Sequence, residues 1–319
     1  MGNYGDSGNA VVLRQRLAMR GIDAEIIEIT LADPVPDSLD TYTLGGAALL
    51  ANRPREAVEA LTRPLQWELM LRPTQARGYF YFFVLTTSLH VLGLHDQELV
   101  EARRGRAIYP DLPGIRLCEI QALAALGRLE EMEKVILETL TLPTKISSPG
   151  EVLLLTAAEL RVHGHREESL RMADRATEWS RGHPVDEGQA ERARSELAEC
   201  LYQAERWEEA RALYAELATA HPDNVDYQRW LGCLAARRGD HAEAMRVAEE
   251  LRRTKQPYLL GRTTAARACI AALLGEREEA VALLRESAAE GVSLPFQHRD
   301  MDLEPLIGYP PFEELVRPK

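Results

Sequence analysis

Residues 192–222 read RARSELAECLYQAERWEEARALYAELATAHP, and residues 226–251 read DYQRWLGCLAARRGDHAEAMRVAEEL. When the two stretches are aligned, Leu197 falls on Leu231 and Ala210 falls on Ala244, both 34 residues apart. Each stretch has an apolar helical pattern, a tight turn, and a second helical pattern that opens with an acidic step and an alanine. A period of this length with two helical patterns per unit predicts stacked helix pairs.

Further copies of the unit extend in both directions. A large side chain early in the second helix would hold the two backbones of a pair apart, so a small residue is expected there. In the units that can be aligned, this position is occupied by Ala57, Met132, Ser169, Ala210, Ala244 and Ala280. The turns of other units fall at Asn52, Gly93, Gly127, Gly164, Gly239 and Gly275. The pattern predicts seven helix pairs over about residues 38–291.

The fold class expected from this pattern is all-α: a right-handed α-solenoid of about seven helix-turn-helix repeats, with a short N-terminal helix-strand segment. Three regions are expected, namely an N-terminal segment over residues 1–37, repeats over residues 38–291 and a C-terminal cap over residues 292–319. Such units bury their apolar faces only against neighbouring units. Phe312 and Leu315 in the cap are spaced to sit on the last repeat.

The repeat unit resembles the tetratricopeptide repeat, which has Leu–Gly or Leu–Ala in its first helix and Ala early in its second. Leu231–Gly232 has the Leu–Gly form of that pattern, and Leu197–Ala198 has the Leu–Ala form, a mild departure from Leu–Gly. From about residue 44 onward, the chain is similar to the repeat region of bacterial proteins linked to a Ser/Thr kinase or cyclase. ANRPREAVEAL (51–61), SLHVLG (88–93) and the ending HRDMDLEPL…PPFEELVRPK (298–319) carry the likeness. No kinase motif accompanies it.

The first residues follow a different pattern. YGDSGN (4–9) precedes an expected helix over about residues 8–20, and DAEIIEITL (23–31) alternates like a strand. Residues 1–45 resemble the N-terminal fragment of class I glutamine amidotransferases of the cobyric acid synthase type. The matching residues are Tyr4, Gly5, Asp6, Gly8, Asn9, Arg20, Gly21, Asp40, Tyr42, Leu44, Gly45 and Gly46. We expect Val11, Leu13, Leu17 and Met19 to pack against the first repeats.

That family needs a cysteine nucleophile on a sharp strand-to-helix turn with a histidine beside it. The four cysteines instead lie within helical patterns, far apart and without a CxxC pair: Cys118, Cys200, Cys233 and Cys269. We therefore expect inert thiols and a fragment without activity. His163 and His165 flank Gly164, but no third ligand lies nearby in the sequence, so a solvated turn is expected. No catalytic, cofactor-binding or metal-binding residue is assigned.

Charge and hydropathy narrow the classes of partner. The formal net charge is −12, from 50 acidic and 38 basic side chains. A nucleic-acid footprint and an anionic membrane surface both need basic residues, so neither partner is expected. No apolar run approaches the roughly 18–20 residues that span a bilayer, and no secretory signal pattern opens the chain. A reducing cytoplasm is the expected location.

Five consecutive aromatic residues, Tyr79, Phe80, Tyr81, Phe82 and Phe83, project on all sides of their expected helix. Either neighbouring elements bury the helix on most sides, or part of the run is an interaction surface for a partner or a second copy. The sequence favours burial without deciding the question.

Repeat arrays bind ligands on their concave face, which is formed by the first helices. We expect the partner-binding positions to be Phe83, Thr87, Gln121, Arg161, Ser195, Glu199, Tyr202, Arg229, Arg237 and Arg262. The leading hypothesis is a non-enzymatic scaffold or adaptor that binds a protein or peptide. The alternatives are an enzyme related to glutamine amidotransferases and a regulatory module acting with a separate kinase or cyclase.

Overall fold

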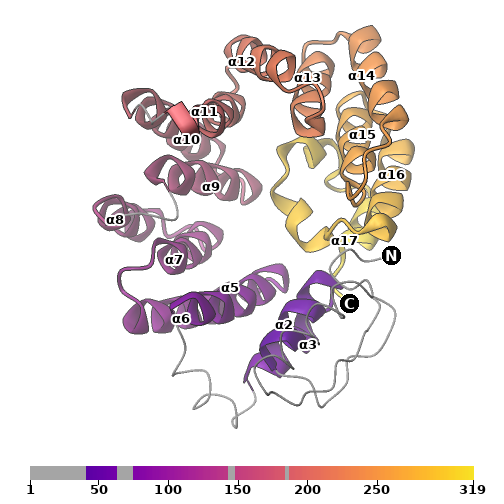
Figure 1. The fold of residues 1–319 in the computed structure, drawn as a ribbon. Helices are drawn as coiled ribbons and strands as arrows, with labels where there is room; N and C mark the ends of the chain where they lie inside the picture. Colours follow the sequence, from indigo (N-terminus) through magenta and orange to yellow (C-terminus); the bar gives the residue numbers. More distant parts are fainter. Residues whose placement is uncertain (1–40, 63–74, 143–147, 184–186) are drawn as a thin grey trace, which may run out of the picture.

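The computed structural model describes residues 41–62, 75–142, 148–183 and 187–319. These residues form helices and contain no strand, and most of the helices lie in antiparallel pairs (Figure 1). The pairs are α2 (Thr41–Leu50) with α3 (Pro54–Thr62), α5 (Gln75–Val91) with α6 (His95–Ile108), α7 (Pro113–Ala125) with α8 (Leu129–Leu140), α9 (Pro149–Val162) with α10 (Arg166–Gly182), α11 (Ala190–Gln203) with α12 (Trp207–Ala220), α13 (Val225–Arg237) with α14 (His241–Arg253), and α15 (Arg262–Leu273) with α16 (Arg277–Glu290).

Short elements complete the described chain: η2 (Glu187–Gln189), η3 (Leu294–Arg299), η4 (Met301–Leu306) and α17 (Pro310–Val316). The predicted all-α solenoid of helix pairs is confirmed. The helix-strand segment expected at the N-terminus, with its amidotransferase likeness and its packing on the first repeats, lies outside the described residues, apart from the last few matching positions at the start of α2.

The turn inside each pair uses one residue in the left-handed backbone region. Glycine, which has no Cβ to clash there, occupies most of these turns, with φ between +66° and +84°. Asn52 and Glu205 take the same role in the first and fifth pairs, with φ of 58° and 57°. The next amide closes the turn on a carbonyl five residues back, as from Asp240 N to Ala235 O at 2.9 Å.

Close helix crossings explain the small residues. Ala57, Ala210, Ala244 and Ala280 are each 0% exposed. In the fourth pair Ser169 takes the position, and its hydroxyl donates to Ala157 O of the partner helix at 2.7 Å. Met132 is also buried, so the third pair accommodates a larger side chain at this position.

The stacked pairs curve into an arc that almost closes (Figure 1). From α2 and α3 the chain runs along one side through α10, and α13 to α16 return along the other side. The end of the described chain then meets the first pair, because Asn52 Nδ2 donates to Arg317 O at 3.1 Å and Lys319 N donates to Asn52 O at 3.0 Å. The concave face is therefore enclosed by elements from both ends of the described range, residues 41–319.

The aromatic run lies on α5, which is covered by α2, α3, α6 and α7. Tyr81 and Phe82 are buried, and the Tyr81 hydroxyl donates to Leu61 O at 3.2 Å. The idea that all five aromatic residues form a self-association patch is therefore corrected: Tyr81 and Phe82 are core residues. Tyr79, Phe80 and Phe83 are half-buried, so only they retain accessible surface.

Candidate functional site

After the last helix pair, the chain enters the concave face. We call η3 and η4 together, residues 294–306, the C-terminal segment. It contacts α9 and α15, and its η3 part also contacts α2 and α17. Asp300 caps η4 by accepting a hydrogen bond from Asp302 N at 3.0 Å. Further on, α17 packs on α16, with Phe312 buried in the cluster of apolar side chains there and Leu315 against it.

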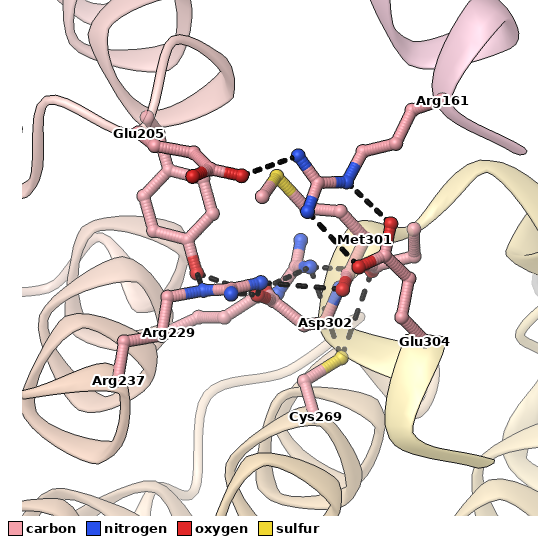
Figure 2. A network of polar contacts seen from close by, with 10 residues as sticks. Arg161, Glu205, Arg229, Arg237, Cys269, Met301, Asp302 and Glu304 are labelled. Carbon is pink, nitrogen blue, oxygen red and sulfur yellow. Dashed lines mark hydrogen bonds and ion pairs between the residues drawn. The ribbon is translucent and has the colours of Figure 1, made fainter. Parts of the chain in front are cut away.

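Asp302 holds this segment in place. Its side chain is 0% exposed and accepts hydrogen bonds from Tyr202 Oη at 2.5 Å and from Arg237 Nη2 at 2.7 Å (Figure 2). Arg229 Nη2 lies 3.4 Å from the other carboxylate oxygen. A buried carboxylate is stable only when it is paired and hydrogen-bonded, and here the pairing comes from α11 and α13.

Two further ion pairs extend the network. Arg161 on α9 contacts Glu304 on η4 and also lies 2.8 Å from Glu205, in the turn between α11 and α12 (Figure 2). Arg229 contacts Asp300 as well as Asp302. Arginines of the first helices therefore form ion pairs with an acidic stretch of the same chain.

Beside this contact, a cavity of about 410 Å³ remains. Its wall is mainly apolar, with polar groups at a few points. The lining side chains come from α5, α7, α9, α11, α13 and the C-terminal segment, and include Tyr79, Phe83, Leu117, Gln121, Leu155, Ala158, Glu199, Gln203, Arg229, Trp230, Arg299 and Asp300. A volume of this size is typical of a small ligand pocket.

Two polar residues lie at the cavity. Gln203 lines it, and its Oε1 is buried without a hydrogen-bond partner among the described residues, which costs free energy. Burial raises the pKa of Glu199 to about 7, against the opposing effect of Arg229. Glu199 can therefore either donate or accept a hydrogen bond near neutral pH.

The structure divides the ten partner-binding positions expected from the sequence. Phe83, Gln121, Glu199 and Arg229 line the cavity together. Arg161, Tyr202 and Arg237 instead bind the C-terminal segment, so their polar atoms are already engaged.

The remaining three positions lie elsewhere. Thr87 is buried in α5, and Ser195 is half-buried beside Tyr227. Arg262 pairs with Asp226 in a wider, more open depression of about 520 Å³ between α12, α13 and the start of α15. These three side chains do not line the cavity, and their part in partner binding stays a prediction.

Sequence reasoning missed several cavity residues. Gln203, Trp230 and Arg299 line the cavity but were not among the expected positions. Trp230 is adjacent to Arg229 on α13, and the Arg229 guanidinium lies 4.5 Å from its ring centroid. The sequence did contain one indication of where the C-terminal segment lies. RDMDLE (299–304) carries three acidic residues, which could have been matched with the arginines of the first helices.

The four cysteine side chains are buried in the helices. Burial raises the pKa of Cys118 to about 11 and that of Cys200 to about 12, and it raises those of Cys233 and Cys269 well above their usual range. A cysteine nucleophile requires a lowered pKa, so these thiols have the opposite character.

Comparison with known families fits this geometry. Residues 156–225 and 195–258 match the family model described as tetratricopeptide repeat. This part of the chain thus has the sequence pattern of tetratricopeptide repeats. The match covers the fifth helix pair and most of its two neighbours, where the sequence period of 34 is clearest. A search of curated proteins gave no match.

Two solved structures are similar to the chain. A tetratricopeptide repeat protein from Parabacteroides merdae is 15% identical with a TM-score of 0.45, and the alignment covers 84% of this chain and 97% of that one. The human IFIT1 dimer with PPP-AAAA is 13% identical with a TM-score of 0.42, covering 98% of this chain and 73% of that one. Within the described residues, every helix is too short or too polar to cross a membrane.

Proposed function

We propose that the chain is a non-enzymatic scaffold that binds a protein partner through an extended peptide segment at the concave cavity. The observation that carries this proposal is the cavity itself, which has a mainly apolar wall with a few polar residues and lies on the concave side of a repeat array. Arrays of this type bind their ligands on the concave surface.

The shape and chemistry of the cavity favour one anchoring side chain of a peptide. Phe83, Leu117 and Trp230 offer apolar contacts to an aliphatic or aromatic group. The side-chain amides of Gln121 and Gln203 line the same cavity, and a side-chain amide can both donate and accept hydrogen bonds. Compact apolar anchors surrounded by polar contacts provide most of the affinity in many interfaces.

The proposal is tested by filling the cavity with a larger side chain. Ala158 lines the cavity and is half-buried, so Ala158→Trp should occupy the space of the anchoring side chain. Peptides would be selected from a random library on the purified chain, and their affinity measured by fluorescence polarisation. We expect the selected peptides to share an apolar anchor and to bind Ala158→Trp at least about tenfold more weakly.

Ala212→Trp is the matched control, because Ala212 is exposed on α12 and does not line the cavity. It should retain full affinity, and circular dichroism should show that both variants fold. Equal peptide affinity for Ala158→Trp and the unmodified chain, or no selected peptide at all, would contradict the proposal. The resemblance to kinase-linked repeat regions makes a kinase or cyclase one partner to include in such binding experiments.

A further inference from the structure

Three histidines and two glutamates meet where α5 ends and α9 ends. His90 lies at the end of α5, His95 and Glu98 lie in α6, and Glu159 and His163 lie at the end of α9. The imidazole rings contact one another in pairs, with centroids 4.9 Å apart for His90 and His95 and 5.3 Å apart for His90 and His163. Glu98 and Glu159 are each 1% exposed at the side chain.

Three atoms of the cluster form a compact triangle. His90 Nε2 and His163 Nε2 each lie 3.0 Å from Glu159 Oε1, and the two nitrogens are 3.4 Å apart. A Zn²⁺ ion with bonds of about 2.0–2.1 Å holds tetrahedral ligand atoms about 3.4 Å apart. The triangle therefore matches one face of such a tetrahedron with little movement of the side chains.

A second carboxylate, that of Glu98, orients the His90 ring. Glu98 Oε2 lies 3.0 Å from His90 Nδ1 and 3.0 Å from His95 Nδ1. Histidine ligands of metals usually donate their other ring N–H to a carboxylate, which fixes the tautomer and ring orientation. His90 therefore has its Nδ1 bound by Glu98 and its Nε2 directed at the triangle.

Glu159 has one carboxylate oxygen that accepts no hydrogen bond from the described residues. This atom, Oε2, is buried, and Arg299 Nη1 of the C-terminal segment is 3.7 Å away.

We propose that His90 Nε2, His163 Nε2 and Glu159 form a site for a divalent transition metal, with Zn²⁺ as the best match. Glu98 acts as the outer carboxylate that positions His90. Two histidines and one carboxylate are a common ligand set for Zn²⁺, and the fourth position is left to water. His163 is 19% exposed at the side chain, which gives the ion a path from solvent.

The bound metal ties together elements that are distant in sequence. His90 belongs to the second helix pair and Glu159 to the fourth, and both lie on the side of the arc reached by Arg299. A bound metal would therefore connect the second helix pair with the fourth. Because metal binding stabilises only the folded arrangement, it raises the melting temperature.

The first test uses the full chain after dialysis against a chelator. Isothermal titration with Zn²⁺ should show one site per chain, and Zn²⁺ but not Mg²⁺ should raise the melting temperature. His163→Asn should weaken Zn²⁺ binding at least tenfold, and Glu98→Gln about 10- to 100-fold. His241→Ala is the matched control, because His241 is exposed on α14, and it should bind like the unmodified chain.

X-ray absorption of the Zn²⁺-loaded unmodified chain gives a result that does not depend on how well a variant folds. It should show nitrogen and oxygen ligands at about 2.0–2.1 Å, including two imidazoles, and no sulfur. Absence of Zn²⁺ binding, sulfur ligands, or unchanged affinity in folded His163→Asn would each overturn the proposal.

Discussion

Glu199 is a carboxyl group whose surroundings oppose its ionisation. Burial is the largest cause of its raised pKa, and the charges of Asp300, Glu196 and Glu151 act in the same direction. Arg229 is the facing group that acts against them. The side chain thus retains its proton in the folded chain up to about pH 7 but loses it near pH 4.5 when the chain unfolds.

This difference predicts a pH-dependent stability. Between about pH 4.5 and 7 the folded chain binds more protons at this group than the unfolded chain does, so stability falls as pH rises through that window. Glu199→Gln removes the effect and should gain about 1–3 kcal/mol relative to the unmodified chain at pH 8. Melting temperatures between pH 5 and 8 check this, and parallel pH profiles for the two proteins would contradict it.

At the scale of the element, the turn between paired helices sets the geometry of each unit. Gly239 joins α13 to α14 with φ of +75°, and no other atom would lie within 4 Å of an added Cβ. The cost of a side chain at this turn is therefore backbone strain alone.

Gly239→Ala should consequently lower the free energy of unfolding by about 1–2 kcal/mol. Gly182→Ala is the matched control, because Gly182 ends α10 in open space with an ordinary φ. Alanine is the better helix former, so this control should be neutral or stabilising by up to about 1 kcal/mol. Urea denaturation of both variants gives the comparison, and an equal loss in the two would refute the strain argument.

The elements could be predicted because their signals are local. Period, turn residues and small crossing residues all lie within one unit, and the seven pairs follow from them. Turn residues other than glycine were harder to recognise. Asn52 was identified as a turn residue, but Glu205 was not, because glutamate is not a residue type that indicates a left-handed turn, although its backbone conformation is the same.

The site was harder to predict from the sequence because its contacts join residues that are far apart in the chain. The pattern of first-helix positions placed Phe83 and Glu199 on the concave face, and both line the cavity. It could not show that Glu304 would fold back onto Arg161, 143 residues earlier. Glu159 and His163 are four residues apart on one helix, a spacing readable from sequence, but the approach of His90 depends on how the units stack.

At the scale of the whole molecule, the arc is held closed from inside by its own C-terminal segment. Arg161 connects α9 on one side of the arc with Glu304 of the C-terminal segment and with Glu205. In an array whose units contact mainly their neighbours, such a connection couples distant units that would otherwise open independently.

Removing the connection should therefore loosen the segment more than the helices. In Arg161→Ala, Glu205 retains Arg166, and Glu304 can be hydrated because it is 37% exposed at the side chain. Charge-assisted hydrogen bonds contribute about 1.5–3 kcal/mol, and partial exposure reduces this to about 1 kcal/mol here. We expect roughly fivefold faster amide exchange over residues 294–306, little change in α13 to α16, and a larger radius of gyration by X-ray scattering.

Arg171→Ala provides the matched control for that measurement. Arg171 is 65% exposed at the side chain and pairs only with Glu168 of its own helix among the contacts of the described residues. Exposed pairs of this kind contribute little, so exchange and radius should stay as in the unmodified chain. Unchanged exchange over residues 294–306 in Arg161→Ala would mean that Asp302 and its partners hold the segment without help from α9, and that the two sides of the arc are not coupled through it.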